Sequence, residues 1–194
     1  MQLIFATSNP HKIKEILSLA PAGFEIQGLK DIGCTEELPE TRGTIEGNSQ
    51  QKAEYVAEKY GVACFSEDTG LEINALDGEP GAYSARYAGT KATYDDNTNM
   101  VLQKMKGETD RTARFKTIIT YYANGKSVQF EGITEGTILE ERKGSEGFGY
   151  DPIFKPLGSN KTYAEMTLAE KNSFSHRKKS FALFANHLAT IAVL

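Results

Sequence analysis

Apolar and polar positions follow two different periods along the chain, and this pattern predicts strands and helices in alternation. Short apolar runs typical of buried strands cover residues 2–7 and 62–66, residues 24–28 are a further strand candidate, and another extended piece covers 71–75. Apolar residues spaced three and four apart predict helices at 10–20, 48–60 and 93–105, and over most of the chain after residue 163. Two β-rich runs, 111–123 and 126–138, flank Asn124-Gly125, a dipeptide that favours a type I′ hairpin turn. This order of elements indicates an α/β fold with a mixed sheet, in a single domain of residues 1–194.

The first and last helices carry capping signals and apolar stripes. Asn9 suits the N-cap, Pro10 suits the first helical position, and Pro21 ends the pattern. One face of the first helix is expected to hold Ile13, Ile16, Leu17 and Ala20. The last helix, with Ser175 as its expected N-cap, has a stripe of Phe181, Phe184, Leu188 and Ile191. Each stripe predicts a helix with one buried face.

The composition excludes several classes of function. The 22 Lys and Arg residues and 26 Asp and Glu residues give a net charge of −4, so bulk charge is not expected to hold a nucleic acid. No stretch approaches the ~18 apolar residues of a membrane span, and residues 1–7 lack the features of a signal peptide. Cys34 and Cys64 match neither a disulfide framework nor a zinc pattern, and we expect both to be reduced packing residues. These features favour a cytoplasmic protein in which a local basic pocket would hold any anionic ligand.

The turn from residue 7 to residue 12 is the first candidate site. A strand runs there into a helix N-terminus, where free backbone N–H groups and the helix dipole favour an anion. Lys12 adds a positive charge within the first helical turn. The alternative is an ordinary capped helix whose lysine faces water.

Two adjacent carboxylates, Glu67 and Asp68, follow the segment 62–66, where we expect a buried strand to end. If the chain is still extended there, the two side chains point to opposite sides of it. One carboxylate could then bind Mg²⁺ or activate water while the other braces the site. A turn closed by Asp68, Thr69 and Gly70 is the structural alternative. An aspartic protease needs two Asp-Thr-Gly sequences and this chain has one, so a dimer would have to supply the second.

Two later segments complete the candidate chemistry. Phe148, in a glycine-rich loop, could stack on a base, and Asp151 could accept a hydrogen bond from a base N–H. The alternative is a loop whose aromatic residues anchor it to the core. Residues 170–179 crowd basic groups near a helix start, where the helix dipole opposes positive charge. An anion or carbonyl oxygen bound there would offset that cost, although a solvated basic face gives the same pattern. A helix break at Ser175 would let Lys171 and Arg177 converge.

Five sequence blocks occur in one order along the chain. They are Ala6-Thr7-Ser8-Asn9-Pro10-His11-Lys12-Ile13-Lys14-Glu15, Glu67-Asp68-Thr69-Gly70-Leu71, Pro80-Gly81-Ala82-Tyr83-Ser84-Ala85-Arg86-Tyr87, Phe148-Gly149-Tyr150-Asp151-Pro152 and Ser175-His176-Arg177. Together they closely resemble the inosine triphosphate pyrophosphatase family, also called XTP/dITP diphosphatases, over nearly the whole chain. The resemblance implies Mg²⁺-dependent hydrolysis of ITP, dITP and XTP to monophosphate and pyrophosphate, by a cytoplasmic homodimer with a house-cleaning role. It also implies an elongated central mixed sheet with flanking helices, two lobes and a cleft.

The resemblance assigns roles to matching positions. The triphosphate is assigned to Thr7, Ser8, Asn9, Pro10, His11 and Lys12, and a further substrate contact to Thr69. Asp68 becomes the proton acceptor and a metal ligand, with Glu40 and Glu67 as further metal-site residues. The base and sugar are assigned to Phe148, Gly149, Tyr150, Asp151, Lys171, His176 and Arg177. The chain departs from the family pattern at Ser8 and His11, where glycine is usual, and at Glu67-Asp68-Thr69, where Asp-Asp-Ser is usual.

The mechanism that these roles imply is an in-line attack of water on the α-phosphorus. Asp68, with an ordinary pKa near ~3.9, would be ionised and ready to take the proton. Donors of Lys171 or Arg177 aimed at O6 would accept hypoxanthine and xanthine and reject adenine. Two alternatives stay open, a Maf-like pyrophosphatase acting on pyrimidine triphosphates and a nucleotide sensor without turnover.

Overall fold

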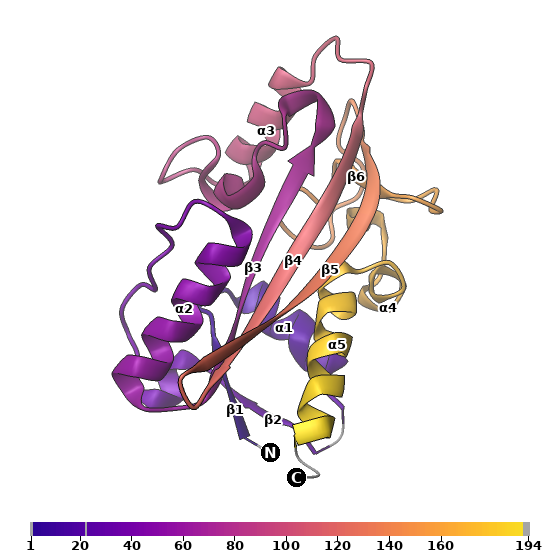
Figure 1. The fold of residues 1–194 in the computed structure, drawn as a ribbon. Helices are drawn as coiled ribbons and strands as arrows, with labels where there is room; N and C mark the ends of the chain where they lie inside the picture. The colour runs from indigo at the N-terminus through magenta and orange to yellow at the C-terminus, as the bar shows by residue number, and fades with distance from the viewer. Residues whose placement is uncertain (1, 22, 192–194) are drawn as a thin grey trace. The chain divides into compact units, whose positions relative to one another are not determined.

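The computed structural model describes residues 2–21 and 23–191 (Figure 1). The strands are β1 (Gln2–Ala6), β2 (Glu25–Gln27), β3 (Cys64–Ile73), β4 (Thr112–Ala123), β5 (Lys126–Ile138) and β6 (Phe154–Pro156). The α-helices are α1 (Pro10–Leu19), α2 (Ile45–Tyr60), α3 (Tyr94–Lys104), α4 (Leu168–Asn172) and α5 (His176–Ile191). Within the described residues, no helix combines the length and apolar character that crossing a bilayer requires.

The six strands form one mixed sheet in the order β2-β1-β3-β4-β5-β6. Strand β1 pairs in parallel with β2, where Gln2 lies opposite Glu25, and with β3, where Ile4 lies opposite Cys64. Strands β5 and β6 pair antiparallel. Parallel neighbours need a crossover, and α1 and α2 provide it between β1, β2 and β3. The predicted fold class, a mixed sheet with flanking helices, is confirmed.

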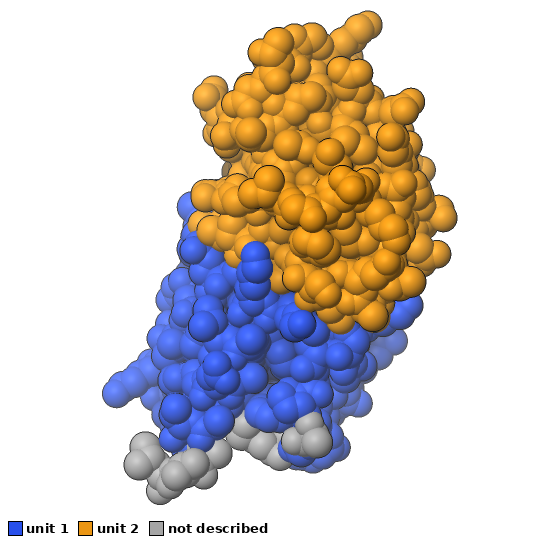
Figure 2. All heavy atoms as spheres, turned by 90° about the vertical axis from the view of Figure 1, so that its right-hand side faces the viewer, with its two compact units in different colours: residues 1–68, 117–132, 177–194 blue, residues 69–116, 133–176 orange. Residues whose placement is uncertain are grey.

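The chain forms two compact units (Figure 2). Unit 1 contains residues 1–68, 117–132 and 177–194, and unit 2 contains residues 69–116 and 133–176. The chain passes from one unit to the other within β3, β4 and β5, and again at the start of α5. The two units correspond to the two lobes that the resemblance implies, while the single domain stays a prediction.

In unit 1 the apolar side chains of β1 are divided between two faces. Leu3 and Phe5 pack with Ile16 of α1 and with Phe181 and Phe184 of α5. On the other face, Ile4 and Ala6 pack with a group from α2 that consists of Ala53, Val56 and Ala57. Successive strand residues point to opposite faces, so a strand that is apolar from residue 3 to residue 6 is covered by helices on both sides.

Unit 2 has a core of its own, to which α3 contributes. Val101 and Met105 of α3 belong to a buried cluster with Leu71 and Ile73 of β3 and with Phe154 of β6. Phe115 and Phe154 meet edge to face, with their ring centroids 4.7 Å apart. This cluster supports the glycine-rich loop that carries Tyr150 and Asp151.

Two local predictions hold in detail. Asn9 caps α1, since its side chain accepts the N–H groups of His11 and Lys12, and Pro10 is the first helical residue. Asn124 and Gly125 have φ values of 53° and 73°, as a type I′ turn requires. The predicted hairpin is therefore confirmed, with β4 and β5 on either side of it.

Other local predictions are wrong. Residues 62–66 and 71–75 are not separate extended pieces, because β3 continues through the acidic residues from Cys64 to Ile73. The alternative of a turn at Asp68 is wrong for the same reason. The strand continues through Glu67 and Asp68 because cations from the helices neutralise both carboxylates. Leu17 is 53% exposed, whereas Glu15, on the supposed polar side of α1, is buried against an arginine. Ile191, at the end of α5, is also exposed.

Candidate functional site

The two neighbouring carboxylates of β3 face different partners. Glu67 contacts Arg177 of α5 and Lys12 of α1. Asp68 contacts Lys52 of α2. In unit 1, α2 covers one face of the sheet, and α1 and α5 cover the other. The predicted opposite orientation of the Glu67 and Asp68 side chains is therefore confirmed.

Asp68 shares a buried ammonium group with Glu40. Lys52 Nζ lies 3.0 Å from Asp68 Oδ1 and 2.5 Å from Glu40 Oε1. Burial alone would lower the pKa of Lys52, but the carboxylates of Asp68 and Glu40 outweigh burial and raise it. Burial raises the pKa of Asp68, and Lys52 and Lys12 oppose this only in part. One protonated lysine between two carboxylates leaves a net negative charge, which makes the buried carboxylate the harder one to ionise.

The same pair of carboxylates fits a divalent cation. Their oxygens already converge on one positive charge, the Lys52 ammonium group. Mg²⁺ is commonly held by one or two carboxylates, with the other positions filled by water and substrate phosphates. Within residues 2–21 and 23–191, no group of three or more His, Cys, Asp and Glu side chains is arranged as a complete metal site. The carboxylates of Glu40 and Asp68 therefore suit a Mg²⁺ ion whose remaining ligands are water and the phosphates of a substrate.

Glu67 is held in a buried charge cluster. Arg177 donates from Nε to Glu67 Oε2 at 2.7 Å and from Nη2 to Glu67 Oε1 at 2.8 Å, and it also donates to Glu15. Lys12 Nζ lies 3.3 Å from Glu67 Oε1. The carboxylates of Glu67 and Glu15 overcome burial and raise the pKa of Arg177. Since both oxygens of Glu67 accept hydrogen bonds from cations, this residue braces the site from the face opposite Asp68.

The turn before α1 presents an exposed surface beside a partly buried lysine. Ser8, Pro10 and His11 are exposed, and Lys12 is half-buried. Asn9 Oδ1 accepts the N–H groups of His11 at 3.0 Å and of Lys12 at 3.3 Å. The helix N-terminus is thus capped by its own side chain, and Lys12 supplies the full positive charge of this turn.

In unit 2 the sequence-predicted residues Asp151 and Lys171 form a buried ion pair. Lys171 Nζ lies 2.6 Å from Asp151 Oδ2. The same oxygen accepts the Phe148 N–H at 2.9 Å. A Cβ atom on Gly147 would lie 2.0 Å from it, so only glycine fits at that position. Asp151 therefore holds its own loop and the lysine together.

Aromatic rings surround the Lys171 ammonium group. Nζ lies 5.2 Å from the ring centroid of Phe148 and 5.1 Å from that of Tyr163. Tyr94 of α3 contacts Phe148, with 5.9 Å between the ring centroids. Tyr150 is buried, and its hydroxyl donates to the Ser84 carbonyl at 2.8 Å. The loop is thus both an aromatic surface and an anchored element, so the two expectations for it are compatible.

The remaining sequence-predicted residues occupy separate environments. The ring of His176 is buried and stacks on Phe115, with 4.9 Å between the ring centroids. Thr69 is half-buried on β3 in unit 2, directly after Asp68. The helix break predicted at Ser175 is confirmed, since α4 ends at Asn172 and α5 begins at His176. Lys171 pairs within unit 2, whereas Arg177 pairs within unit 1.

Two residues of the site were missed by the sequence analysis, Lys52 and Glu15. Lys52 lies one residue before Ala53 on the buried face of α2, and Glu15 lies next to the buried Ile16 on α1. A charged residue inside a helical apolar pattern was the available signal, because such a residue is rarely buried without a partner. Their partners are far along the chain, so the pattern alone does not identify them.

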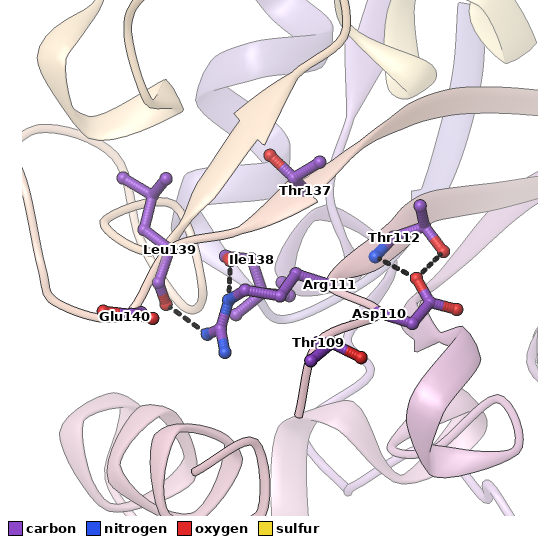
Figure 3. A pocket seen from close by; sticks show the side chains of 8 residues that line it. All are labelled: Thr109, Asp110, Arg111, Thr112, Thr137, Ile138, Leu139 and Glu140. Atoms are coloured by element: carbon purple, nitrogen blue, oxygen red, sulfur yellow. Dashed lines mark hydrogen bonds between the residues drawn. The ribbon is translucent and has the colours of Figure 1, made fainter. Parts of the chain in front are cut away.

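An open hollow of about 450 Å³ lies elsewhere in unit 2 (Figure 3). Arg111 donates there to the carbonyls of Ile138 at 2.6 Å and Leu139 at 2.8 Å. Asp110 accepts from the backbone and hydroxyl of Thr112. The polar groups of Arg111 and Asp110 are thus engaged in hydrogen bonds within the chain. The hollow lies where β4 begins and β5 ends, and none of the predicted site residues lines it.

Known proteins resemble this chain over nearly its full length. The model of the Ham1 family matches residues 3–187. The dITP/XTP pyrophosphatase of Flavobacterium johnsoniae is 51% identical over 180 residues, which are 93% of this chain and 94% of that protein. The dITP/XTP pyrophosphatase of Porphyromonas gingivalis is 46% identical over 188 residues, covering 96% and 97%. The structure of the Staphylococcus aureus Ham1 protein superimposes with a TM-score of 0.89 at 32% identity, covering 98% of this chain and 99% of that one. The chain therefore belongs to the Ham1 family, and the family resemblance identified from the sequence is confirmed.

Proposed function

We propose that this protein hydrolyses the non-standard purine nucleoside triphosphates ITP, dITP and XTP to the monophosphate and pyrophosphate. The observation that carries the proposal is the cluster of Asp68, Glu40 and Lys52, in which Asp68 and Lys52 are buried. It holds a candidate base and a second carboxylate around one positive charge. The names of the relatives support the reaction and its substrates, since they are dITP/XTP pyrophosphatases.

Unit 1 carries groups suited to the triphosphate. Lys12 supplies a charge beside the turn of Thr7, Ser8, Asn9, Pro10 and His11, in which Ser8, Pro10 and His11 are exposed. We assign Glu40 and Asp68 as ligands of Mg²⁺, because their oxygens already converge on one cation. When bound, Mg²⁺ would neutralise charge that accumulates on the phosphate oxygens. Glu67 acts through Arg177 and Lys12 to brace this face of the sheet, and not as a metal ligand.

Asp68 is the proton acceptor in this mechanism. Water attacks the α-phosphorus in line with the leaving pyrophosphate, and a carboxylate oxygen of Asp68 takes a proton from that water. The buried position raises the pKa of Asp68, which makes the carboxylate a stronger base than an exposed aspartate. Lys12 stabilises the negative charge of the departing pyrophosphate.

Unit 2 carries groups suited to the base and sugar. Phe148 offers a ring for stacking, and Lys171 offers an ammonium donor to O6 of hypoxanthine or xanthine. Adenine has an amino group at that position, so the donor would be left without an acceptor. Gly149, Tyr150, Asp151 and His176 shape and anchor this loop region, with Thr69 as a further substrate contact. In unit 1, Arg177 keeps its role through Glu67 and Glu15.

The cellular setting follows from the same reaction. An enzyme that removes such nucleotides from the pool acts where nucleic acid precursors are stored, which is the cytoplasm. The resemblance further suggests a homodimer. Neither a nucleic acid nor a membrane is needed as a partner, because the substrate is a free nucleotide.

The test is the release of pyrophosphate and orthophosphate from ITP, dITP, XTP, ATP, GTP and dTTP, with and without Mg²⁺. We expect Mg²⁺-dependent pyrophosphate from the first three nucleotides and little from the others. Orthophosphate in place of pyrophosphate would contradict attack at the α-phosphorus. Preference for dTTP would favour a Maf-like enzyme, and tight ITP binding without release would favour a sensor.

A further inference from the structure

Residues 40–42, here called the Glu40 segment, are held against α2 by several of its side chains. At Glu40, Oε1 accepts from Lys52 Nζ at 2.5 Å. At Thr41, Gln51 makes two contacts, since its Oε1 accepts the backbone N–H at 2.8 Å and its Nε2 donates to Oγ1 at 2.9 Å. The N–H of Thr41 belongs to the peptide that follows Glu40, so Gln51 fixes the orientation of that peptide plane.

Asn48 fixes the next peptide in the same way. Its Oδ1 accepts the Arg42 N–H at 3.1 Å, and the Arg42 guanidinium group pairs with Glu54 at 2.5 Å. Asn48 is fully buried, and among residues 2–21 and 23–191 its Nδ2 is the one buried side-chain nitrogen or oxygen atom without a hydrogen-bond partner. An unsatisfied buried amide is costly to the folded state. The folded state bears this cost at the residue whose Oδ1 accepts the hydrogen bond from the Arg42 N–H of the Glu40 segment.

The spacing of these anchors matches a helix surface. Asn48, Gln51 and Lys52 lie at i, i+3 and i+4, which places them on one side of α2. The segment therefore lies along a rigid 16-residue helix that also carries the lysine of the Asp68 cluster. A carboxylate on such a support keeps its place relative to Asp68, and metal affinity depends on that kind of placement.

We propose that Gln51 and Asn48 are positioning residues that set the affinity of the enzyme for its divalent cation. They do so by fixing the two peptide planes that follow Glu40. The inference rests on the assignment of Glu40 as a metal ligand under the proposed function. Neither residue touches the substrate or the reacting atoms in this scheme.

The direct test compares Gln51→Met with the matched control Gln50→Met. Gln50 is the neighbouring glutamine of α2, and its Nε2 donates to Glu54 within the helix. Binding of Mn²⁺ is measured by the electron paramagnetic resonance signal of the free ion. The Mg²⁺ concentration for half-maximal pyrophosphate release from ITP is the second readout. We expect about a tenfold loss of metal affinity in Gln51→Met, the scale found for residues that orient metal ligands, and none in the control.

The folded state should be nearly unaffected by Gln51→Met, because its contacts with Thr41 are exposed. A loss of metal affinity at an unchanged unfolding midpoint therefore supports positioning, and unchanged metal affinity overturns it. Asn48→Ala gives a second, independent measurement on the next peptide, and we expect it to weaken Mn²⁺ binding in the same direction.

Glu40→Gln separates this inference from the assignment on which it rests. If Glu40→Gln leaves Mn²⁺ affinity unchanged, the metal role of Glu40 fails and the positioning proposal fails with it. If Glu40→Gln weakens binding and Gln51→Met does not, the metal assignment stands and the positioning proposal alone is wrong.

Discussion

Glu67 and Asp68 are neighbours on one strand, yet each is paired with a different cation from a different helix. Arg177 binds Glu67 with two hydrogen bonds of 2.7 and 2.8 Å, whereas Lys52 binds Asp68 at 3.0 Å. A strand turns successive side chains to opposite faces, so two adjacent carboxylates can do separate work without competing for one partner. Glu67 secures the strand to α1 and α5, and Asp68 is the residue that we propose as the base.

Asp68→Asn should retain nucleotide binding and lose most turnover. The amide has nearly the shape of the carboxylate, but it cannot take a proton from the attacking water and is a poor metal ligand. General base catalysis typically contributes ~10²–10⁴-fold, and a loss in that range is expected. Pyrophosphate release gives the rate, and binding of ITP by calorimetry gives the control. Near-normal turnover in this variant would remove Asp68 from its role as base.

The pH dependence of the reaction should show the effect of burial on Asp68. Its pKa is raised above the usual 3.8, so the base becomes protonated, and activity is lost, as the pH falls through that raised value. A bound cation favours the ionised carboxylate and should move this acid limb to lower pH. The measurement is kcat/KM for ITP against pH at low and high Mg²⁺. An acid limb that does not respond to Mg²⁺ would contradict the shared site of base and metal.

Lys171→Ala should relax the preference for ITP over ATP. The ammonium group is buried between Asp151 and two aromatic rings, where it can reject a base that has no acceptor at position 6. The ratio of kcat/KM values for the two nucleotides is the measurement. Lys161→Ala is the matched control, because Lys161 pairs with Glu170 on the exposed surface of the same unit. An unchanged ratio in Lys171→Ala would place recognition of the base elsewhere.

Glu15→Gln should destabilise the protein strongly. Removing this carboxylate leaves an uncompensated positive charge among buried Arg177, buried Glu67 and half-buried Lys12. Removing one partner of a buried ion pair costs about 3–5 kcal/mol, and a drop of that order in the free energy of unfolding is expected. Urea unfolding measures it. Lys104→Ala, which removes an exposed pair with Glu79, should leave the unfolding midpoint almost unchanged. If the two variants have the same free energy of unfolding, the Glu15 contact does not contribute to stability.

Features encoded by neighbouring residues could be predicted from the sequence. The cap at Asn9 and the turn at Asn124-Gly125 depend on local backbone geometry, and both are present. The inner faces of α2 and α5 follow from spacing, apart from Ile191 at the end of α5. The strand through Glu67 and Asp68 could not be predicted in this way, because polar residues in a row resemble a turn until their partners are known.

The sequence by itself determined the family, the mixed sheet and the residue types that carry the chemistry, since these depend on motifs and periodicity. The tertiary structure decided which charge meets which. Arg177 is 110 positions from Glu67 and 162 from Glu15, and Lys52 reaches Asp68 only when α2 packs on β3. The physical reason is that a buried charge is stable only beside an opposite charge, and that partner comes from a distant part of the chain.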